Sequence, residues 1–127
     1  MSQWIPILIL LALVVSACSQ EDSVDELPMG DAARGADLFT QSINGAPPCS
    51  GCHTLDGNPL VGPSFHEYGK TASARRTGIT AQQYTYTSIV RPGDYVVDGF
   101  SNVMYSQFGQ RLSRQQIADL IAYLLTL

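Results

Sequence analysis

Five consecutive residues, Cys49-Ser50-Gly51-Cys52-His53, constrain this chain more than any other stretch. The two cysteines stand three positions apart, a spacing that places their thiols to add across the two vinyl groups of one haem. The histidine that follows Cys52 at once is then held over the iron as an axial ligand. This C-x-x-C-H order is the attachment pattern of c-type haem. It therefore predicts one covalent haem c, bound through Cys49 and Cys52 and ligated by His53.

A C-x-x-C pair has two other common uses. A thioredoxin-like redox motif needs a βαβ context, and no alternating strand pattern flanks the pair in this sequence. A structural zinc site needs four ligands in tetrahedral geometry, and the chain offers only Cys18, Cys49, Cys52, His53 and His66. Haem attachment is favoured over both.

The chain is short and modestly acidic. Its 127 residues allow one small domain plus a targeting segment, and a buried porphyrin can supply part of a core that is thin at this size. The net charge is −4, and no stretch of the sequence concentrates Lys and Arg. Nucleic acid is therefore not an expected partner. Two cysteines assigned to haem leave Cys18 for a separate role at the N-terminus.

The N-terminal residues have the pattern of an export signal. Residues 4–15 are almost wholly apolar, a length that fits the core of a signal peptide and falls short of the roughly 20 residues that span a bilayer. The run ends in Val15-Ser16-Ala17-Cys18, which resembles the lipobox of bacterial lipoproteins. That resemblance implies cleavage before Cys18 and lipidation of its thiol, although Met1-Ser2-Gln3 carries no Lys or Arg. An uncleaved signal anchor is the alternative, and it too ties the domain to a membrane.

The sequence thus divides into three parts. Residues 1–17 are predicted to be a lipoprotein signal peptide and 31–127 the folded domain. Between them, residues 18–30 hold four acids and no base, a composition typical of a solvated tether. The domain itself holds seven acids and seven bases, since the chain's eleven acids include those four, so strong electrostatic steering of a partner is not expected.

Two helices are predicted at the ends of the domain. Asp31 is a helix cap, and Gly35 and Phe39 lie on one face of the helix that follows, which should end near Ser42. Ser113-Arg114-Gln115-Gln116 is a capping box that opens a helix running to the C-terminus. This pair resembles the crossed terminal helices of class I cytochromes c, in which Gly35, Phe39 and Tyr123 match the residues of the crossing. The resemblance implies an all-α fold with a short middle helix around one haem.

The same family implies a support for the axial histidine. A neutral histidine ligand usually donates its other ring N–H to a carbonyl oxygen, and class I cytochromes c supply that oxygen from a Gly-Pro about ten residues further along. Gly62-Pro63 occupies that place. We expect the backbone oxygen of Pro63 to hold His53, with a simple turn as the alternative.

A second capping box, Thr80 with Gln83, predicts the middle helix, which should end before Pro92. Residues 84–104 are similar to the haem c domain of subunit II of caa3-type oxidases. That similarity makes Tyr84, Tyr86 and Arg91 candidate contacts of the haem edge or its propionates. Packing in the core or on the surface is the competing interpretation of all three.

The sixth ligand of the iron has three candidates. Met104 lies in Asn102-Val103-Met104-Tyr105, just before the last helix, where class I cytochromes c place their axial methionine. Tyr105 stands where the family commonly has proline. His66 follows Pro63 too closely to cross the porphyrin easily, and Met29 lies in the tether. We expect Met104, since methionine and histidine ligation raises the reduction potential.

Together these features predict a monohaem c-type cytochrome that carries single electrons without being an enzyme itself. The expected partners are a quinol-oxidising donor and a terminal oxidase acceptor, in respiratory or photosynthetic chains, either as a free carrier or as a subunit. The expected location is the bacterial cell envelope, anchored on the periplasmic or extracytoplasmic side. Two alternatives stay open. One is a haem enzyme or gas-binding protein whose iron has an open or displaceable sixth ligand. The other is a structural subunit whose haem only stabilises the fold.

Overall fold

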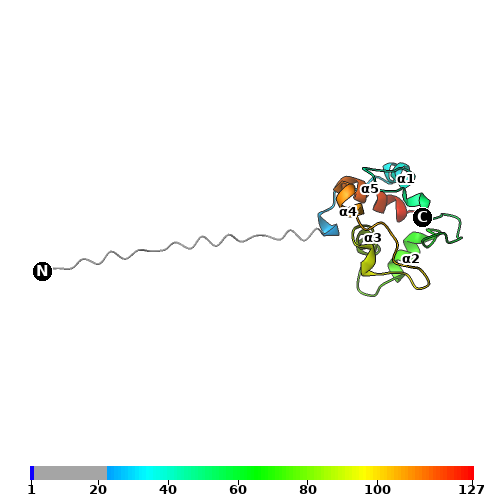
Figure 1. Ribbon diagram of the computed structural model, residues 1–127. Helices are drawn as coiled ribbons and strands as arrows, with labels where there is room; N and C mark the ends of the chain where they lie inside the picture. The colour runs from blue at the N-terminus through cyan, green and yellow to red at the C-terminus, as the bar shows by residue number, and fades with distance from the viewer. Residues whose placement is uncertain (2–22) are drawn as a thin grey trace.

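The computed structural model describes residues 23–127 together with Met1, so the predicted signal peptide and Cys18 lie outside the described residues. The described part is helical, as predicted, and contains no β-strand (Figure 1). None of its helices is long and apolar enough to cross a membrane. The elements in chain order are η1 (Val24–Glu26), α1 (Ala32–Phe39), η2 (Cys49–Gly51), α2 (Tyr68–Ala74), α3 (Ala81–Val90), η3 (Pro92–Asp94), α4 (Phe108–Arg111) and α5 (Arg114–Leu124).

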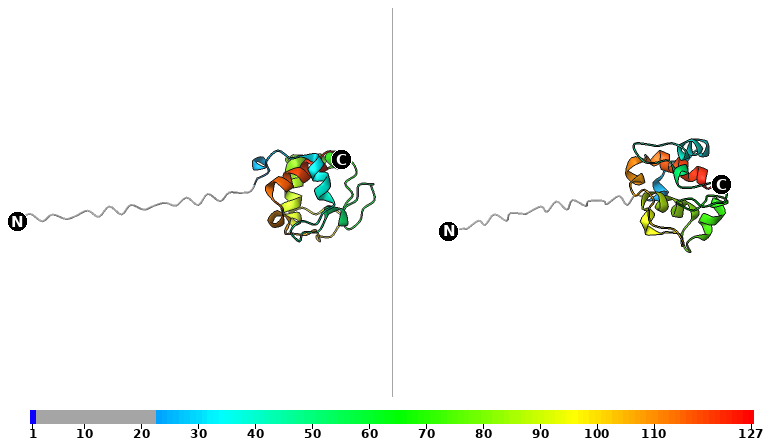
Figure 2. Two further views of the ribbon diagram at one scale, coloured as in Figure 1. Left: turned by 90° about the horizontal axis from the view of Figure 1, so that it is seen from above. Right: turned by 45° about the vertical axis from the view of Figure 1, so that its right-hand side comes forward.

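The first and last α-helices cross at close range, as Figures 1 and 2 show for α1 in cyan and α5 in orange to red. Gly35 makes the crossing possible, because a Cβ at this position would collide with the backbone carbonyl oxygen of Asp119 on α5. One turn later, the ring of Phe39 meets that of Tyr123 edge to face, with centroids 5.8 Å apart. The predicted crossed pair is therefore confirmed, with α1 ending at Phe39 rather than near Ser42.

Both predicted capping boxes are present. Thr80 and Gln83 exchange hydrogen bonds between side chains and backbone N–H groups at the start of α3, and Ser113 and Gln116 do the same at α5. Each box satisfies two N–H groups that a helix start would otherwise leave unpaired. The last helix stops at Leu124 rather than at the C-terminus, with Leu125 as its cap.

Helix α2 was not predicted. It begins after Glu67, whose backbone is left-handed at φ 51°, and no cap side chain marks its start. Tertiary contacts hold it instead. The Gly69 N–H donates to the carbonyl oxygen of Leu127 at 3.0 Å, and Ala72 is buried in the core.

The segment before α1 differs from the predicted solvated tether. Val24 is only 7% exposed and belongs to the core, and Leu27 packs against that core. The Met29 carbonyl oxygen accepts a hydrogen bond of 2.9 Å from Gln115. Acidic composition pointed to solvent, but the apolar side chains of Val24 and Leu27 face the domain. Residues 23–30 therefore pack on the domain.

Candidate haem site

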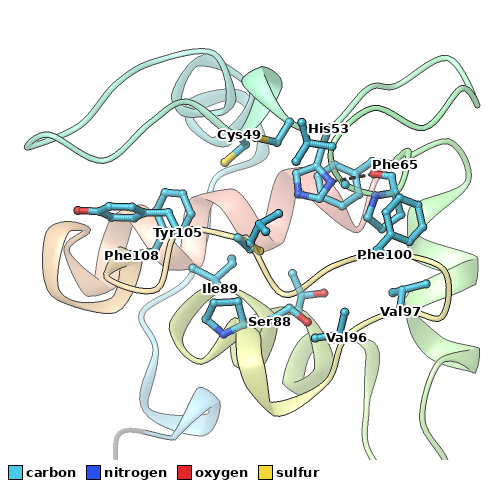
Figure 3. Close-up of a pocket in the computed structure, with 18 of the residues that line it drawn as sticks. Cys49, His53, Phe65, Ser88, Ile89, Val96, Val97, Phe100, Tyr105 and Phe108 are labelled. Atoms are coloured by element: carbon cyan, nitrogen blue, oxygen red, sulfur yellow. Dashed lines mark hydrogen bonds between the residues drawn. The ribbon is translucent and has the colours of Figure 1, made fainter.

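A large apolar cavity lies between the loop that carries the C-x-x-C-H motif and the helices α3 and α5 (Figure 3). Counted together with the solvent at its open mouth, it holds about 1230 Å³ of space between the surrounding atoms. Ser88 and Ile89 of α3 face His53 across it in Figure 3. Leu120 and Leu124 of α5 also contribute to its wall.

The two motif cysteines line this cavity. Cys49 opens the short turn η2, and its carbonyl oxygen accepts the N–H groups of Cys52 at 3.1 Å and His53 at 3.0 Å. This tight turn brings both thiols and the imidazole to one wall of the cavity. Neither cysteine is in a disulfide. Burial raises the pKa of Cys49 to about 11, whereas a reactive redox thiol requires a depressed pKa.

His53 is held on three sides. Its Nδ1 lies 2.8 Å from the carbonyl oxygen of Pro63, the contact expected from the Gly-Pro pair. Since a carbonyl can only accept, Nδ1 carries the hydrogen and Nε2 keeps a free lone pair. The ring packs on Gly62, where a Cβ would stand 2.8 Å from Nδ1 and 3.0 Å from Nε2. On another side, the ring of Phe65 stacks on the imidazole with centroids 4.3 Å apart and planes 12° from parallel.

The electrostatics of His53 also suit a metal ligand. Burial lowers its pKa, more than the Pro63 carbonyl raises it, so the neutral imidazole is favoured. A neutral ring with one nitrogen fixed by a carbonyl is the usual state of a histidine ligand.

Of the three candidates for the sixth ligand, only Met104 lines the cavity. Its thioether is partly buried against the core, in the loop between η3 and α4. Met29 is 92% exposed, and exposed His66 lies beside Gly57, outside the cavity wall.

Of the three residues on or just after α3 that were predicted to contact the haem, one lines the cavity and two do not. Tyr84 lines the cavity, and burial raises its pKa. Tyr86 and Arg91 do not line it. Tyr86 lies two positions after Tyr84 and so points to another face of α3, while exposed Arg91 pairs with Asp94 at 2.8 Å. That these two residues contact the haem therefore stays a prediction, which the lining of the cavity does not support.

Sequence reasoning missed Arg75, the C-cap of α2. It is the only permanently charged side chain in the cavity wall, and no carboxylate lines that wall in the described part of the chain. A haem brings two propionate carboxylates, so a guanidinium here suits that cofactor. Arg75 was overlooked because the position of its side chain depends on α2, which the sequence pattern does not reveal.

A buried hydrogen-bond chain forms part of the cavity wall. Thr85 donates its hydroxyl hydrogen to the Ala81 carbonyl oxygen at 2.7 Å, so the Tyr68 hydroxyl must donate to Thr85, 3.0 Å away. Burial raises the pKa of Tyr68 to about 12. Both residues line the cavity, and this neutral pair joins α2 to α3 there.

Comparison with known protein families identifies the fold. Residues 32–127 match the family model described as Cytochrome c. The chain belongs to the cytochrome c family. Cytochromes c bind haem c covalently, and the cavity of this cytochrome c fits that group, because two unpaired thiols, an oriented imidazole, a thioether and a guanidinium surround an otherwise apolar space. No curated protein matches the chain.

The zinc alternative called for four protein ligands. In the part of this cytochrome c that the structure describes, no group of three or more His, Cys, Asp or Glu side chains is arranged to hold a metal ion.

Proposed function

We propose that this cytochrome c is a membrane-anchored monohaem electron carrier whose iron is ligated by His53 and Met104. Family membership supports an electron-transfer haem protein in general terms. The observation that carries the more specific proposal is that one cavity is lined by all four groups required, namely Cys49, Cys52, His53 and Met104.

Each residue has a defined role in the proposal. The thiols of Cys49 and Cys52 each add their S–H across a vinyl group, which forms a thioether bond with no leaving group. His53 presents its Nε2 lone pair, because Pro63 occupies the other ring nitrogen. Met104 supplies a thioether sulfur as the second protein ligand.

When bound, haem c supplies an iron that alternates between the ferrous and ferric states. The protein contributes two strong ligands that leave no position for a substrate, and an apolar wall that excludes water. Two apolar side chains of the cavity lining, Val61 and Val103, are 51% and 62% exposed, and we place the mouth of the cavity at them. We propose that this mouth is where redox partners approach.

The anchor is the second part of the proposal. The lipobox-like sequence before Cys18 supports export, lipidation of that cysteine and attachment to the cell envelope on the periplasmic or extracytoplasmic side. Two or more acyl chains suffice for stable anchoring. The partners proposed are a quinol-oxidising complex as donor and a terminal oxidase as acceptor, and the carrier is either free in the membrane plane or a subunit of one complex.

Replacing the proposed sixth ligand tests the redox part. In the haem-loaded protein, Met104→Ala should lower the reduction potential and allow carbon monoxide to bind the ferrous iron. Met29→Ala is the matched control, because Met29 is 92% exposed, and it should change neither property. If the unmodified protein itself binds carbon monoxide readily, the haem enzyme or gas-binding alternative replaces the carrier.

Removing the proposed lipidation site tests the anchor. Cys18→Ser should release the protein from the membrane fraction. If the variant stays in the membrane, retention is due to the apolar residues 4–15 or to a partner complex, and lipidation is not the anchor.

A further inference from the structure

The packed segment before α1, residues 23–31, is bound along its length to the folded domain, and we call it the strap. Val24 is buried at its start, and Glu26 lies 3.9 Å from Arg114 in an ion pair. At its end, the Asp31 N–H donates to the Asp119 carboxylate at 2.8 Å. Gly30 packs so tightly on α5 that a Cβ would collide with the carbonyl oxygen of Ala118. The strap is thus part of the fold.

On α3 the strap and the cavity use different faces. Leu27 shares a shallow groove with Tyr86 and Val90, which lie four positions apart and therefore on one side of the helix. The cavity is lined instead by Thr85 and Ile89, which are likewise four positions apart, on another side. In Figure 3 the light-blue strap runs to the left of α3, while Ser88 and Ile89 point from α3 into the cavity.

On α5 the same division holds. The strap contacts Arg114, Gln115, Ala118 and Asp119, whereas the cavity is lined by Leu120 and Leu124. At 3.6 residues per turn, Gln115, Ala118 and Asp119 lie roughly opposite the two leucines, and Arg114 lies between the two sides. The pair of helices α3 and α5 therefore separates the strap from the cavity.

The strap also fixes how far the domain can move from an anchor at Cys18. Only residues 19–22 connect Cys18 to Ser23, where the described segment begins. Five steps along the chain reach about 18 Å at full extension, whereas the thirteen steps to Asp31 would reach about 45 Å. Because the strap is packed on the domain, the shorter limit applies.

From these contacts we infer that the strap sets the orientation of the anchored domain. The side of the α3 and α5 pair on which the strap packs faces the bilayer, and the cavity mouth faces the aqueous phase. The direct redox partners are then protein domains that stand out from the membrane, rather than quinols dissolved in it. This inference rests on the membrane anchor proposed above and adds the class of partner that can reach the cavity.

Two spin labels on the full, haem-loaded chain test the orientation in phosphatidylethanolamine and phosphatidylglycerol vesicles. One replaces exposed Leu60, next to the cavity mouth, and the other exposed Gln110, in the groove that Leu27 of the strap also lines. The haem is kept ferrous and low-spin so that it does not relax the labels. Relaxation by oxygen, which concentrates in lipid, is compared with relaxation by a water-soluble nickel chelate.

We expect the ratio of oxygen to nickel relaxation to be several-fold higher at position 110 than at position 60. Val24→Asp, which places a charge at the buried end of the strap, should make the two ratios equal while leaving the haem spectrum unchanged. Met29→Asp is the matched control, because it adds the same charge to the same strap at a side chain that is 92% exposed, and it should preserve the difference.

Even if Val24→Asp fails to fold, the relaxation ratios at positions 60 and 110 in the chain with an intact strap test the orientation. Equal ratios at the two positions, or a higher ratio at position 60, would overturn the orientation while leaving the anchor in place. A chain that does not float with the vesicles would instead disprove the anchor and remove this inference with it.

Discussion

The backbone carbonyl oxygen of Pro63 lies 2.8 Å from Nδ1 of His53, ten residues earlier in the chain. This contact fixes the tautomer of the imidazole and increases its electron donation toward any metal at Nε2. Gly62, directly before Pro63, lets the backbone come this close to the ring. The two residues therefore work together as the support of the proposed axial ligand.

Gly62→Ala should disturb that support. The new Cβ would stand within 3.0 Å of both ring nitrogens, so the imidazole must tilt away from the Pro63 carbonyl. A weaker hydrogen bond makes the imidazole a poorer donor to ferric iron, and the reduction potential should rise. A redox titration of the haem-loaded protein measures this.

The control for that titration is Gly51→Ala, where the nearest atom to a new Cβ is 3.8 Å away. This variant should keep the potential of the unmodified protein. An unchanged potential in Gly62→Ala would show that the hydrogen bond does not tune the iron.

Asp119 should make stability depend on pH. Its buried carboxylate accepts hydrogen bonds from Arg34 at 2.8 and 2.9 Å, from the Asp31 N–H at 2.8 Å and from Gln115 at 2.8 Å. These bonds, that of Arg34 first, lower its pKa below the usual value. Asp119→Asn should reduce the free energy of unfolding at pH 7 by about 2 kcal/mol, because an amide cannot accept all of them.

The sign of the pH effect follows from the lowered pKa. A carboxyl whose pKa is depressed in the folded state contributes its full stabilisation above its unfolded pKa of about 3.9. That contribution is lost as the pH falls through the lower native value. The stability gap between the protein and Asp119→Asn should be constant above about pH 5 and shrink below about pH 4.

Denaturant titrations between pH 2 and pH 8 measure the gap. Asp94→Asn is the control, because the exposed pair of Asp94 with Arg91 should contribute less than about 1 kcal/mol. A gap for Asp119→Asn that stays the same down to pH 2 would contradict the assignment.

Arg75 should set the ionisation of the haem propionates. Its guanidinium is the only permanent charge in the described cavity wall, and a nearby positive charge favours both an ionised carboxylate and ferrous iron. Arg75→Gln should therefore lower the reduction potential and move any pH dependence of the potential to higher pH.

The matched control for this variant is Arg76→Gln. Arg76 is the next residue but stacks on Tyr95, 5.6 Å from the ring centroid, and does not line the cavity. Potentials measured between pH 5 and pH 9 should separate the two variants. Equal effects of both would mean that Arg75 acts only through overall charge.

The sequence was most informative where a structure is determined locally. A capping box spans four residues, so α3 and α5 could be located from Thr80 and Ser113 alone. The turn of the C-x-x-C-H motif is equally local. The crossing of α1 and α5 is not local, and it was predicted from resemblance to class I cytochromes c rather than from the pattern of Gly35 and Phe39.

What the sequence did not reveal depends on distant contacts. Helix α2 is held by the C-terminal residue Leu127, and Arg75 reaches the cavity only through that helix. Residues 18–30 hold four acids, and composition gave no sign that Val24 would be buried. Phe65, stacked on His53, had no motif that would distinguish it from other aromatic residues.

The ferric absorption spectrum of the haem-loaded protein tests the central claim most directly. Ligation by His53 and Met104 predicts a low-spin spectrum with the weak far-red band of charge transfer between methionine sulfur and ferric iron, and Met104→Ala should lose that band. A high-spin spectrum of the unmodified protein would contradict the account, because it would mean an open iron and a haem enzyme or gas-binding protein.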